Sequence, residues 1–452
     1  MSKPRSSTGR SAPAQQTAAA AGPRPRVIIV GSGFGGLEAA KRLGKEPVEV
    51  LLIDRHNYHL FQPLLYQVAT AGLEPEEVAH PVRSILRGQR NAHFLVAEVQ
   101  QVDLDNRSVQ TDAGTISYDY LILAAGSTDH FFGMQSLEAG AHGLKDIDEA
   151  MSLRNHILSR FEAATWIRDP ARRRMLLTFV IVGGGPTGVE FAGALSELVG
   201  VVLPRDFPGL DFHEVKVILL EASDRLLSML GPKLQRYTLT TLRSKGVEVR
   251  LNTAVERLAN DRLYFKDAEQ VEASIDAGTV MWAAGVRAAE LAILPAIPRG
   301  RQSRLSVLPG LQLAEHPEVF AIGDIAAVEQ DGAVLPMLAP VAQEEARWTA
   351  RNIGRLLRGE VVLPFRYRDK GTMATIGRQA AVVQIGPFKF TGFFAWLLWL
   401  GLHIVLLIGF RNRLLVLINW AWDYFFYDRA VRLILGDTAV RRARASSEQR
   451  IE

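Results

Sequence analysis

A glycine-rich turn of the form Gly-x-Gly-x-x-Gly occurs twice in this chain, at residues 31–36 and again at residues 183–188. Each copy follows a short β-branched run and precedes a helical pattern, so each is predicted to join a buried parallel strand to a helix. The free backbone N–H groups at such a helix N-terminus bind a pyrophosphate. Two copies therefore predict two dinucleotides bound by one polypeptide.

A carboxylate ends the next predicted strand in both copies, Asp54 in the first and Glu221 in the second. An acid at this place accepts hydrogen bonds from the ribose hydroxyls of an adenosine. Asp54 follows its glycines at the usual separation, whereas Glu221 comes late, which predicts an insertion around residues 199–209. The charge of Glu221 would repel the extra phosphate of NADP, so the second unit is predicted to prefer NADH, although Arg225 could weaken that preference.

Each unit also closes with an apolar strand that ends in small residues, at 120–126 and at 279–285. A later strand ends in Gly323 and Asp324, and we expect it to return to the first unit, so that Asp324 faces the first nucleotide. The sequence therefore predicts an α/β fold with two Rossmann-like dinucleotide-binding domains, the second inserted in the first.

The composition of the chain limits the reactions that the protein can catalyse. The 452 residues, 48% of them hydrophobic, are enough for two or three domains with their own cores, and a net charge of +4 gives no indication of nucleic-acid binding. The chain has no cysteine, which excludes disulfides, thiolate metal sites, iron–sulfur clusters and a catalytic dithiol. The electron acceptor is therefore predicted to be a diffusible molecule or a partner protein. His403 has no second ligand at metal spacing and is predicted to be a packing residue, so no metal site is expected.

These motifs resemble the two-dinucleotide-binding flavoprotein superfamily that includes glutathione reductase, in which the first unit holds FAD and the second holds NAD(P)H. Within that superfamily, the segments 57–69, 342–344 and 367–377 resemble those of type II NADH dehydrogenases. The resemblance covers residues 26–435 and excludes the dithiol members, which do not share these three segments.

The resemblance implies two sets of cofactor-binding residues. Around FAD it implies Gly31, Gly33, Phe34, Gly35, Gly36, Asp54, Gln62, Ala125, Gly126, Gly323, Asp324, Ala342 and Gln343. Around NADH it implies Gly183, Gly185, Gly188, Glu190, Glu221, Ala284 and Gly285.

Three residues are candidates for the chemistry. Glu190 is expected in the first turn of the second helix, where the helix dipole stabilises its charge; it is either a plain helix acid or a group near the nicotinamide that relays a proton. Gln343 is expected just before a helix over 344–357, and is either solvent-facing or, by the resemblance, a quinone-pocket residue. Lys370 is either a surface charge or a cation that stabilises negative charge on reduced flavin or quinone.

The two glycine units and the apolar C-terminal stretch predict the domain boundaries. They are a disordered basic tail at 1–26, an FAD-binding domain whose first part is 27–171, an NADH-binding domain at 172–291, the second part of the FAD-binding domain with the quinone-site segments at 292–385, membrane-associated helices at 386–436, and a basic tail at 437–452.

The C-terminal region is strongly apolar. Residues 393–410 are eighteen residues without a charge, at the lower limit for crossing a bilayer, and a second apolar stretch at 414–427 is interrupted by Asp423. Aromatic residues typical of a lipid–water boundary gather here, namely Trp396, Trp399, Trp420, Trp422, Tyr424 and Tyr427. The segment is interpreted as one transmembrane helix or as a pair of helices lying in one leaflet, which the resemblance favours. A buried dimer interface in a soluble protein is the third alternative.

The predicted function is that of a non-proton-pumping respiratory NADH:quinone oxidoreductase, attached to the lipid bilayer on the cytoplasmic face of the inner membrane. A bacterial source is favoured, with an organellar source, a homodimer, and ubiquinone or menaquinone left open. The alternatives are an FAD/NADH-dependent reductase of a soluble electron carrier and a membrane-docked NADH-binding redox sensor.

Overall fold

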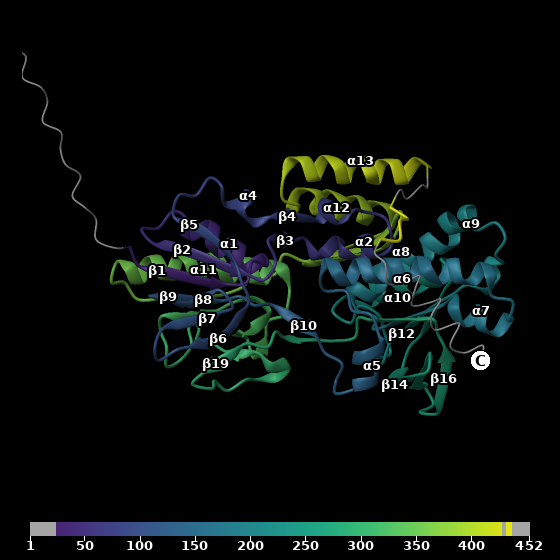
Figure 1. The fold of residues 1–452 in the computed structure, drawn as a ribbon, viewed down its shortest axis with the longest axis horizontal. Coiled ribbons are helices and arrows are strands. Elements are labelled where there is room, and N and C mark those ends of the chain that lie inside the picture. Colours follow the sequence, from purple (N-terminus) through teal and green to yellow (C-terminus); the bar gives the residue numbers. More distant parts are fainter. Residues whose placement is uncertain (1–23, 427–430, 436–452) are drawn as a thin grey trace, which may run out of the picture.

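The computed structural model describes residues 24–426 and 431–435, and its framework is a pair of parallel sheets (Figure 1). The first sheet has the strand order β21-β9-β1-β2-β5 and all of its pairs are parallel. Its strands are β1 (Arg26–Val30), β2 (Glu49–Asp54), β5 (Ala92–Val96), β9 (Tyr120–Leu123) and β21 (Val319–Ala321). The strand β21 does return to the first sheet. Apart from residues 24–26, both predicted tails lie outside the described residues.

The second sheet repeats the same arrangement with the order β13-β12-β11-β17, again with parallel pairs. Its strands are β11 (Thr178–Val182), β12 (Lys216–Leu220), β13 (Val247–Arg250) and β17 (Thr279–Trp282). After their first residues, Arg26 and Thr178, the strands β1 and β11 consist of buried Val, Ile and Phe, as strands covered on both faces require.

Each central strand leads through its glycine turn into a helix. These helices are α1 (Phe34–Leu43), which packs against α11 (Ala339–Leu357), and α8 (Pro186–Glu197), which packs against β25 (Thr372–Gly377). The helix α8 continues as a π-helical turn over Leu198–Val202 and then as α9 (Leu203–Asp206). This helical extension supplies the extra residues that place Glu221 late in the chain.

Smaller sheets cover and connect the two units. They are the sheet of β6 (Val99–Asp103), β7 (Ser108–Thr111), β8 (Gly114–Ser117) and β19 (Ala292–Leu294), the sheet of β14 (Ala254–Ala259), β15 (Arg262–Lys266) and β16 (Glu272–Asp276), and the pair of β10 (Ser127–Asp129) and β18 (Val286–Ala288). Because β10 follows the closure of the first unit and β18 that of the second, their pairing brings the two closures side by side.

Before the C-terminal region, the remaining elements are short, apart from two helices that border the second sheet. The longer ones are α6 (Ile147–Trp166) and α10 (Pro232–Ser244). The short helices are α2 (Leu65–Ala69), α3 (Pro75–Val78), α4 (Val82–Leu86), α5 (Gln135–Gly140), α7 (Pro170–Leu176), η1 (Gln62–Leu64), η3 (Phe212–Glu214), η4 (Arg301–Ser303) and η5 (Gly323–Ile325). The short strands are β3 (Tyr58–Leu60), β4 (Ala79–Pro81), β20 (Leu305–Ser306), β22 (Ala326–Ala327), β23 (Glu329–Gln330) and β24 (Ala333–Val334).

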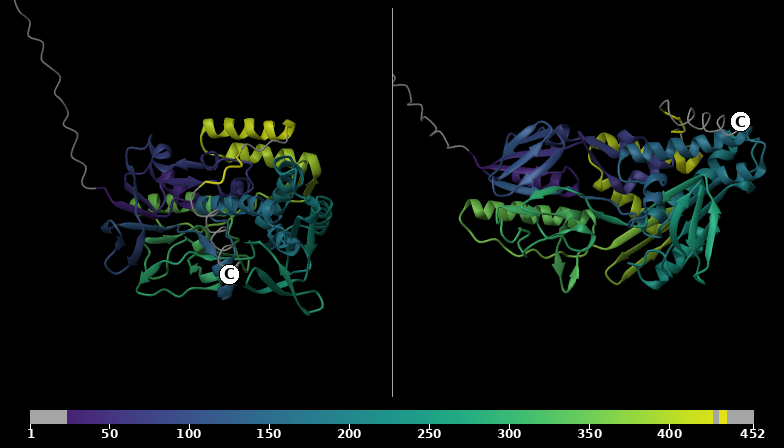
Figure 2. Two further views of the ribbon diagram at one scale, coloured as in Figure 1. Left: turned by 45° about the vertical axis from the view of Figure 1, so that its right-hand side comes forward. Right: turned by 60° about the horizontal axis from the view of Figure 1, so that its bottom comes forward.

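The C-terminal region is a three-stranded sheet followed by two helices. The strands are β25, β26 (Ala380–Ile385) and β27 (Phe388–Thr391), and the helices are α12 (Gly392–Leu406) and α13 (Phe410–Phe426). The two helices lie alongside each other at one edge of the molecule (Figures 1 and 2). The helix α12 has 15 residues, and at roughly 1.5 Å per residue it is about 22 Å long, shorter than the roughly 30 Å of a hydrocarbon core.

The continuous helix over 393–410 that the single-span alternative requires is therefore not present. Among the described residues, one helical stretch, Pro186–Asp206, is long and apolar enough to cross a membrane, and 72% of it is buried inside the protein, as in a core helix.

One part of the aromatic-boundary prediction is wrong. Trp399 is only 1% exposed and stacks on His403 with ring centroids 4.1 Å apart, inside the core that α12 shares with α8 and α6. Trp422, by contrast, is exposed, and Tyr427 lies outside the described residues. An apolar stretch of sequence does not show which helix face packs against the protein and which face is exposed on its surface.

Candidate functional site

The first glycine turn has the backbone geometry that a dinucleotide requires. Gly31 has φ +102°, and a Cβ there would collide with the Ala124 carbonyl at the end of β9. A Cβ at Gly36 would collide with the carbonyl oxygen of Gly31, whereas a Cβ at Gly33, the N-cap of α1, would meet no protein atom within 4 Å. Two glycines thus allow close backbone packing, and the third leaves the helix N-terminus open to a phosphate.

The acid of the first unit is tied to its own glycine turn. Asp54 accepts hydrogen bonds from the Ser32 backbone N–H at 2.6 Å and the Ser32 hydroxyl at 2.8 Å through one oxygen, and from the His56 N–H at 2.8 Å through the other. The carboxylate therefore lies at the C-terminal edge of the sheet beside the turn, where a ribose would be recognised.

The residues predicted around the rest of FAD converge on the same edge. The carboxylate of Asp324 accepts a hydrogen bond from the Ser127 hydroxyl at 2.6 Å, and Ser127 is also 3.3 Å from the Lys145 ammonium. Ser127 directly follows the closure at Ala125 and Gly126, whose φ is +75°. Gly35 packs on Ile322 and on the backbone of Ala342, so β21 and α11 border the turn.

Two other residues in the predicted FAD set contact segments distant in the sequence. Phe34 makes an edge-on contact with His59, with ring centroids 5.1 Å apart. Gln62 is exposed and donates a hydrogen bond to the Lys145 carbonyl at 3.0 Å.

The second unit repeats this construction. Gly183 has φ +111°, and added Cβ atoms at Gly183 and Gly188 would collide with the carbonyls of Ala283 and of Gly183, respectively. Gly185 is the N-cap of α8 and has open space around its Cβ position. Glu221 accepts hydrogen bonds from the Gly184 N–H at 2.5 Å and the Ser223 N–H at 2.7 Å. The acids of the two units therefore hold the same position.

Arg225 is already paired. Its guanidinium makes two hydrogen bonds to the carboxylate of Asp224, at 2.6 and 2.7 Å. The closure of this unit, at Ala284 and Gly285, lies beside Phe132 from the loop that follows β10.

Glu190 is placed differently from the prediction. The helix α8 begins at Pro186, so Glu190 is in the second turn, and the argument from the dipole at the first turn is wrong. Its carboxylate accepts a hydrogen bond from the Thr375 N–H at 3.2 Å. Burial raises the pKa of Glu190 to about 8, opposed by Thr375 and by Trp399, although the indole nitrogen of Trp399 has no hydrogen bond of regular geometry. Glu190 is thus a proton-holding group near neutral pH.

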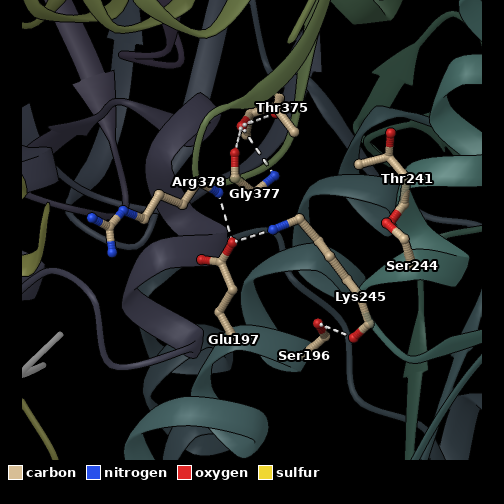
Figure 3. A network of polar contacts seen from close by, with 9 residues as sticks. Ser196, Glu197, Thr241, Ser244, Lys245, Thr375, Gly377 and Arg378 are labelled. Atoms are coloured by element: carbon tan, nitrogen blue, oxygen red, sulfur yellow. Dashed lines mark hydrogen bonds and ion pairs between the residues drawn. The ribbon is translucent and has the colours of Figure 1, made fainter. Parts of the chain in front are cut away.

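A polar network fixes the end of α8 to the β25–β26 hairpin (Figure 3). Glu197 accepts hydrogen bonds from the Arg378 N–H at 2.6 Å and from the Lys245 ammonium at 2.8 Å. The Thr375 hydroxyl bonds to Gly377 on the same strand and donates to the Ala380 carbonyl across the hairpin, and the Arg378 side chain bonds to the Tyr424 carbonyl of α13. Glu190 and Glu197 are seven residues apart, so they share one face of the helix and both accept from the hairpin backbone.

The two remaining catalytic candidates are connected through the helix α11. Gln343 is inside α11 rather than before it, because the helix begins at Ala339. The ammonium of Lys370 pairs with the carboxylate of Glu344 at 2.5 Å, and Lys370 is exposed. The structure thus joins Lys370 to the helix of Gln343, while Glu190 contacts Thr375 and Trp399.

Sequence reasoning missed a cavity of about 120 Å³ between α2, α8, β25 and the C-terminal helices. Its described lining includes Gln67, Thr375, Trp399 and Trp420, and Trp420 donates to Gln67 at 2.8 Å. The sequence predicts a quinone pocket formed by Gln343, Lys370 and the C-terminal helices. The C-terminal helices do line this cavity, whereas Gln343 and Lys370 do not. His403 is packed, as expected, and burial lowers its pKa to about 4.

Two glycine cradles with acids at equivalent positions, joined through paired closures, define a class of two-dinucleotide oxidoreductases. The family model for pyridine nucleotide-disulphide oxidoreductases matches residues 25–346, and a model for the NDH2 C-terminal domain matches residues 370–428.

Comparison with known relatives identifies the family within that class. The chain is 40% identical to the type II NADH:quinone oxidoreductase Ndh of Mycobacterium tuberculosis, over 96% of this chain and 95% of that protein. It is 29% identical to the mitochondrial external NADH-ubiquinone oxidoreductase 2 of Saccharomyces cerevisiae, over 91% and 83%. The fold matches NDH2 from Plasmodium falciparum in complex with NADH, with a TM-score of 0.83 at 19% identity, over 91% of this chain and 100% of that one. The chain belongs to the type II NADH:quinone oxidoreductase family.

Proposed function

We propose that this protein oxidises NADH and reduces a membrane quinone, with FAD bound by the first glycine unit and NADH by the second. The observation that carries the proposal is the repeated cradle, with its two closures brought together by the β10–β18 pair. Both glycine turns fit a dinucleotide because their helix N-termini are uncapped by side chains. When bound, FAD would accept a hydride and pass on its electrons. The protein would position the cofactor and exclude water.

The nicotinamide cofactor is proposed to be NADH rather than NADPH. Glu221 sits at the turn, where it would accept from a free ribose hydroxyl and repel a phosphate. Arg225, the cation that could have accepted the phosphate, is held by Asp224. The structure thus supports a stronger preference than the sequence alone does.

The proposed overall reaction consumes NADH, one proton and a quinone, and yields NAD⁺ and a quinol. Gln343 is proposed to donate a hydrogen bond to a quinone oxygen. Lys370 is proposed to place its ammonium in the same region, where the ion pair with Glu344 orients it. Glu190 is proposed to hold the proton that the quinone needs. The absence of cysteine from the sequence rules out a dithiol relay.

Membrane attachment is proposed to occur through α12 and α13 lying in one leaflet. Their outward residues form an exposed apolar face, most exposed at Phe394 (74%), Phe410 (81%) and Phe425 (73%). An apolar face this large on a single chain marks an interaction surface. Arg411 and Arg413 lie in the first turn of α13, where Arg411 would meet lipid headgroups, while the Arg413 guanidinium bonds to the carbonyls of Val405 and Leu407 at the end of α12. This geometry offers no route for protons across a bilayer, so no proton pumping is proposed.

The experiment is a turnover assay on the purified full chain with NADH and a series of acceptors. A short-chain quinone should support rapid NADH oxidation, and NADPH should replace NADH poorly. Activity only with a soluble protein carrier would indicate the reductase alternative. Reduction of the bound flavin without reoxidation by any short-chain quinone would indicate a sensor and reject the proposal.

The membrane part of the proposal has its own test, which is flotation with anionic and neutral lipid vesicles. The Phe394→Glu/Phe425→Glu double variant should lose vesicle binding while keeping flavin and activity with a water-soluble quinone. The matched control is Val361→Glu, an exposed apolar residue outside α12 and α13 that should leave vesicle binding unchanged. Vesicle binding that survives the double substitution would place the attachment surface elsewhere.

A further inference from the structure

A carboxyl group lies fully buried beside the turn that follows β21. Glu345, on α11, has an exposed fraction of 0%. One of its oxygens accepts a hydrogen bond from the Gly323 backbone N–H at 2.6 Å. The other oxygen is buried and has no hydrogen-bond partner within the part of the chain that the structure describes. A buried acid with one oxygen unpaired is costly and calls for a physical explanation.

A buried cation acts on the other end of the same turn. Arg304 is 4% exposed and donates hydrogen bonds to the Ala326 carbonyl and the Leu335 carbonyl, both at 2.8 Å. The short helix η5, residues Gly323–Ile325, is therefore bound at its first N–H by an acid and just beyond its last residue by a base. Glu345 and Arg304 have opposite charges and act on each other electrostatically.

The turn held in this way carries Asp324. Gly323 has φ +71°, a conformation that glycine adopts without strain, and its Cβ position lies 3.3 Å from the Cβ of Ala342 on α11. The helix that carries Glu345 is thus in direct contact with the turn. Asp324 in turn accepts from Ser127. Because Gly323 directly precedes Asp324, the Glu345–Gly323 bond holds the residue next to the group predicted to face the flavin.

We propose that Glu345 is a positioning residue of the flavin site, which holds the Asp324 turn together with Arg304 and exchanges a proton with solvent when the charge of the bound flavin changes. This inference rests on FAD binding by the first unit, as proposed above.

The charges around Glu345 determine the direction of the effect. Burial raises the pKa of Glu345 to about 8, Arg304 and the Gly323 N–H oppose that rise, and Asp324 adds to it. Hydride transfer from NADH adds one negative charge to the flavin, which raises the affinity of Glu345 for a proton. Below its pKa Glu345 is protonated in both states of the flavin. Between that pKa and the higher pKa that Glu345 has beside the reduced flavin, the carboxylate takes one proton from solvent on reduction and returns it when the electrons pass to the acceptor.

The test is a spectroelectrochemical titration of the flavin in the holoenzyme, from about pH 6 to about pH 10, in the wild type and in Glu345→Gln. The amide keeps an oxygen for the Gly323 N–H and removes the titration. The potentials of the two proteins should run together at low pH, and above about pH 8 the wild-type potential should fall more steeply than that of the variant. The matched control is Glu360→Gln, which removes a partly exposed carboxylate just beyond α11, paired with Arg355 and Arg358, and should follow the wild type.

Parallel curves for wild type and Glu345→Gln across the whole range would overturn the inference. If Glu345→Gln does not fold, proton uptake on reduction of the wild type, followed with an indicator dye, decides the question: uptake should increase by up to one proton per flavin above about pH 8, and constant uptake would contradict it. A wild-type protein purified without FAD would instead reject the proposed function, so the two failures are distinguishable.

Discussion

The two glycine units have the same backbone conformation at their turns and differ in the elements that cover their helices. In both, the first glycine meets the carbonyl of the closing strand, and the last glycine meets the carbonyl of the first. In both, the second residue of the turn donates its N–H to the acid at the end of the next strand. These shared contacts serve any dinucleotide, so they do not distinguish the two cofactors.

The differences lie on the outer side of each helix. The helix α1 packs on α11, where the buried Glu345 bonds the turn beside Asp324. The helix α8 packs on β25, and its own Glu190 bonds the hairpin. Burial raises the pKa of both acids to about 8, one from the covering helix and one from the covered helix. The comparison separates two roles in the proposed function: the glycine turns are proposed to hold the dinucleotides, and the contact between each helix and the element that covers it places a buried acid.

The largest effect expected is from Gly36→Ala and Gly188→Ala. Each added Cβ would collide with a backbone carbonyl, and overpacking of this kind costs about 1–3 kcal/mol or more. Gly36→Ala should lose its FAD, which the flavin absorbance of the purified protein measures. Gly188→Ala should keep FAD, but NADH should not reduce that flavin. Equal loss of flavin in both variants would contradict the account.

The next effect concerns Glu190→Gln. With a pKa near 8, the wild-type carboxyl is protonated below that pH and loses its proton above it. Quinone reduction should therefore decline as pH rises through about 8, and the variant should be slower by about 10²-fold with that decline absent. Stopped-flow measurement of flavin reduction by NADH is the control, because it should change far less. Equal loss in both half-reactions would assign Glu190 to NADH binding instead.

A smaller effect is expected at Glu221, the acid of the second unit. Loss of a hydrogen bond to a charged group costs about 1.5–3 kcal/mol, so Glu221→Gln should lower the ratio of kcat/KM for NADH over NADPH by about 10- to 100-fold. Arg225→Ala should leave that ratio unchanged, because its guanidinium is occupied by Asp224. An unchanged ratio in Glu221→Gln would show that another group selects the cofactor.

The smallest effect is expected for the stability of Lys370→Met. Its ion pair with Glu344 is partly exposed, and such pairs contribute about 0–1 kcal/mol to the free energy of unfolding. Thermal unfolding should thus be nearly unchanged, while the KM for quinone rises. A large drop in the melting temperature with an unchanged KM would make Lys370 a structural residue.

Local patterns in the sequence were enough to predict the two sheets, because glycine turns and β-branched runs are determined by neighbouring residues. The start of α11 was not predictable, since its N-cap, Leu338, makes no side-chain hydrogen bond. The Glu345–Gly323 bond joins residues 22 apart, and the Glu190–Thr375 bond joins residues 185 apart. Such pairings follow from tertiary packing and leave no periodic signal in the sequence.

The central claim is tested most directly by sequential anaerobic mixing of the purified protein. NADH is added first, and the flavin absorbance should be lost; a short-chain quinone is added next, and the absorbance should return within the turnover time. Bleaching by NADH without recovery on addition of quinone would contradict the account. Electrons would then pass from NADH to the flavin but not from the flavin to a quinone.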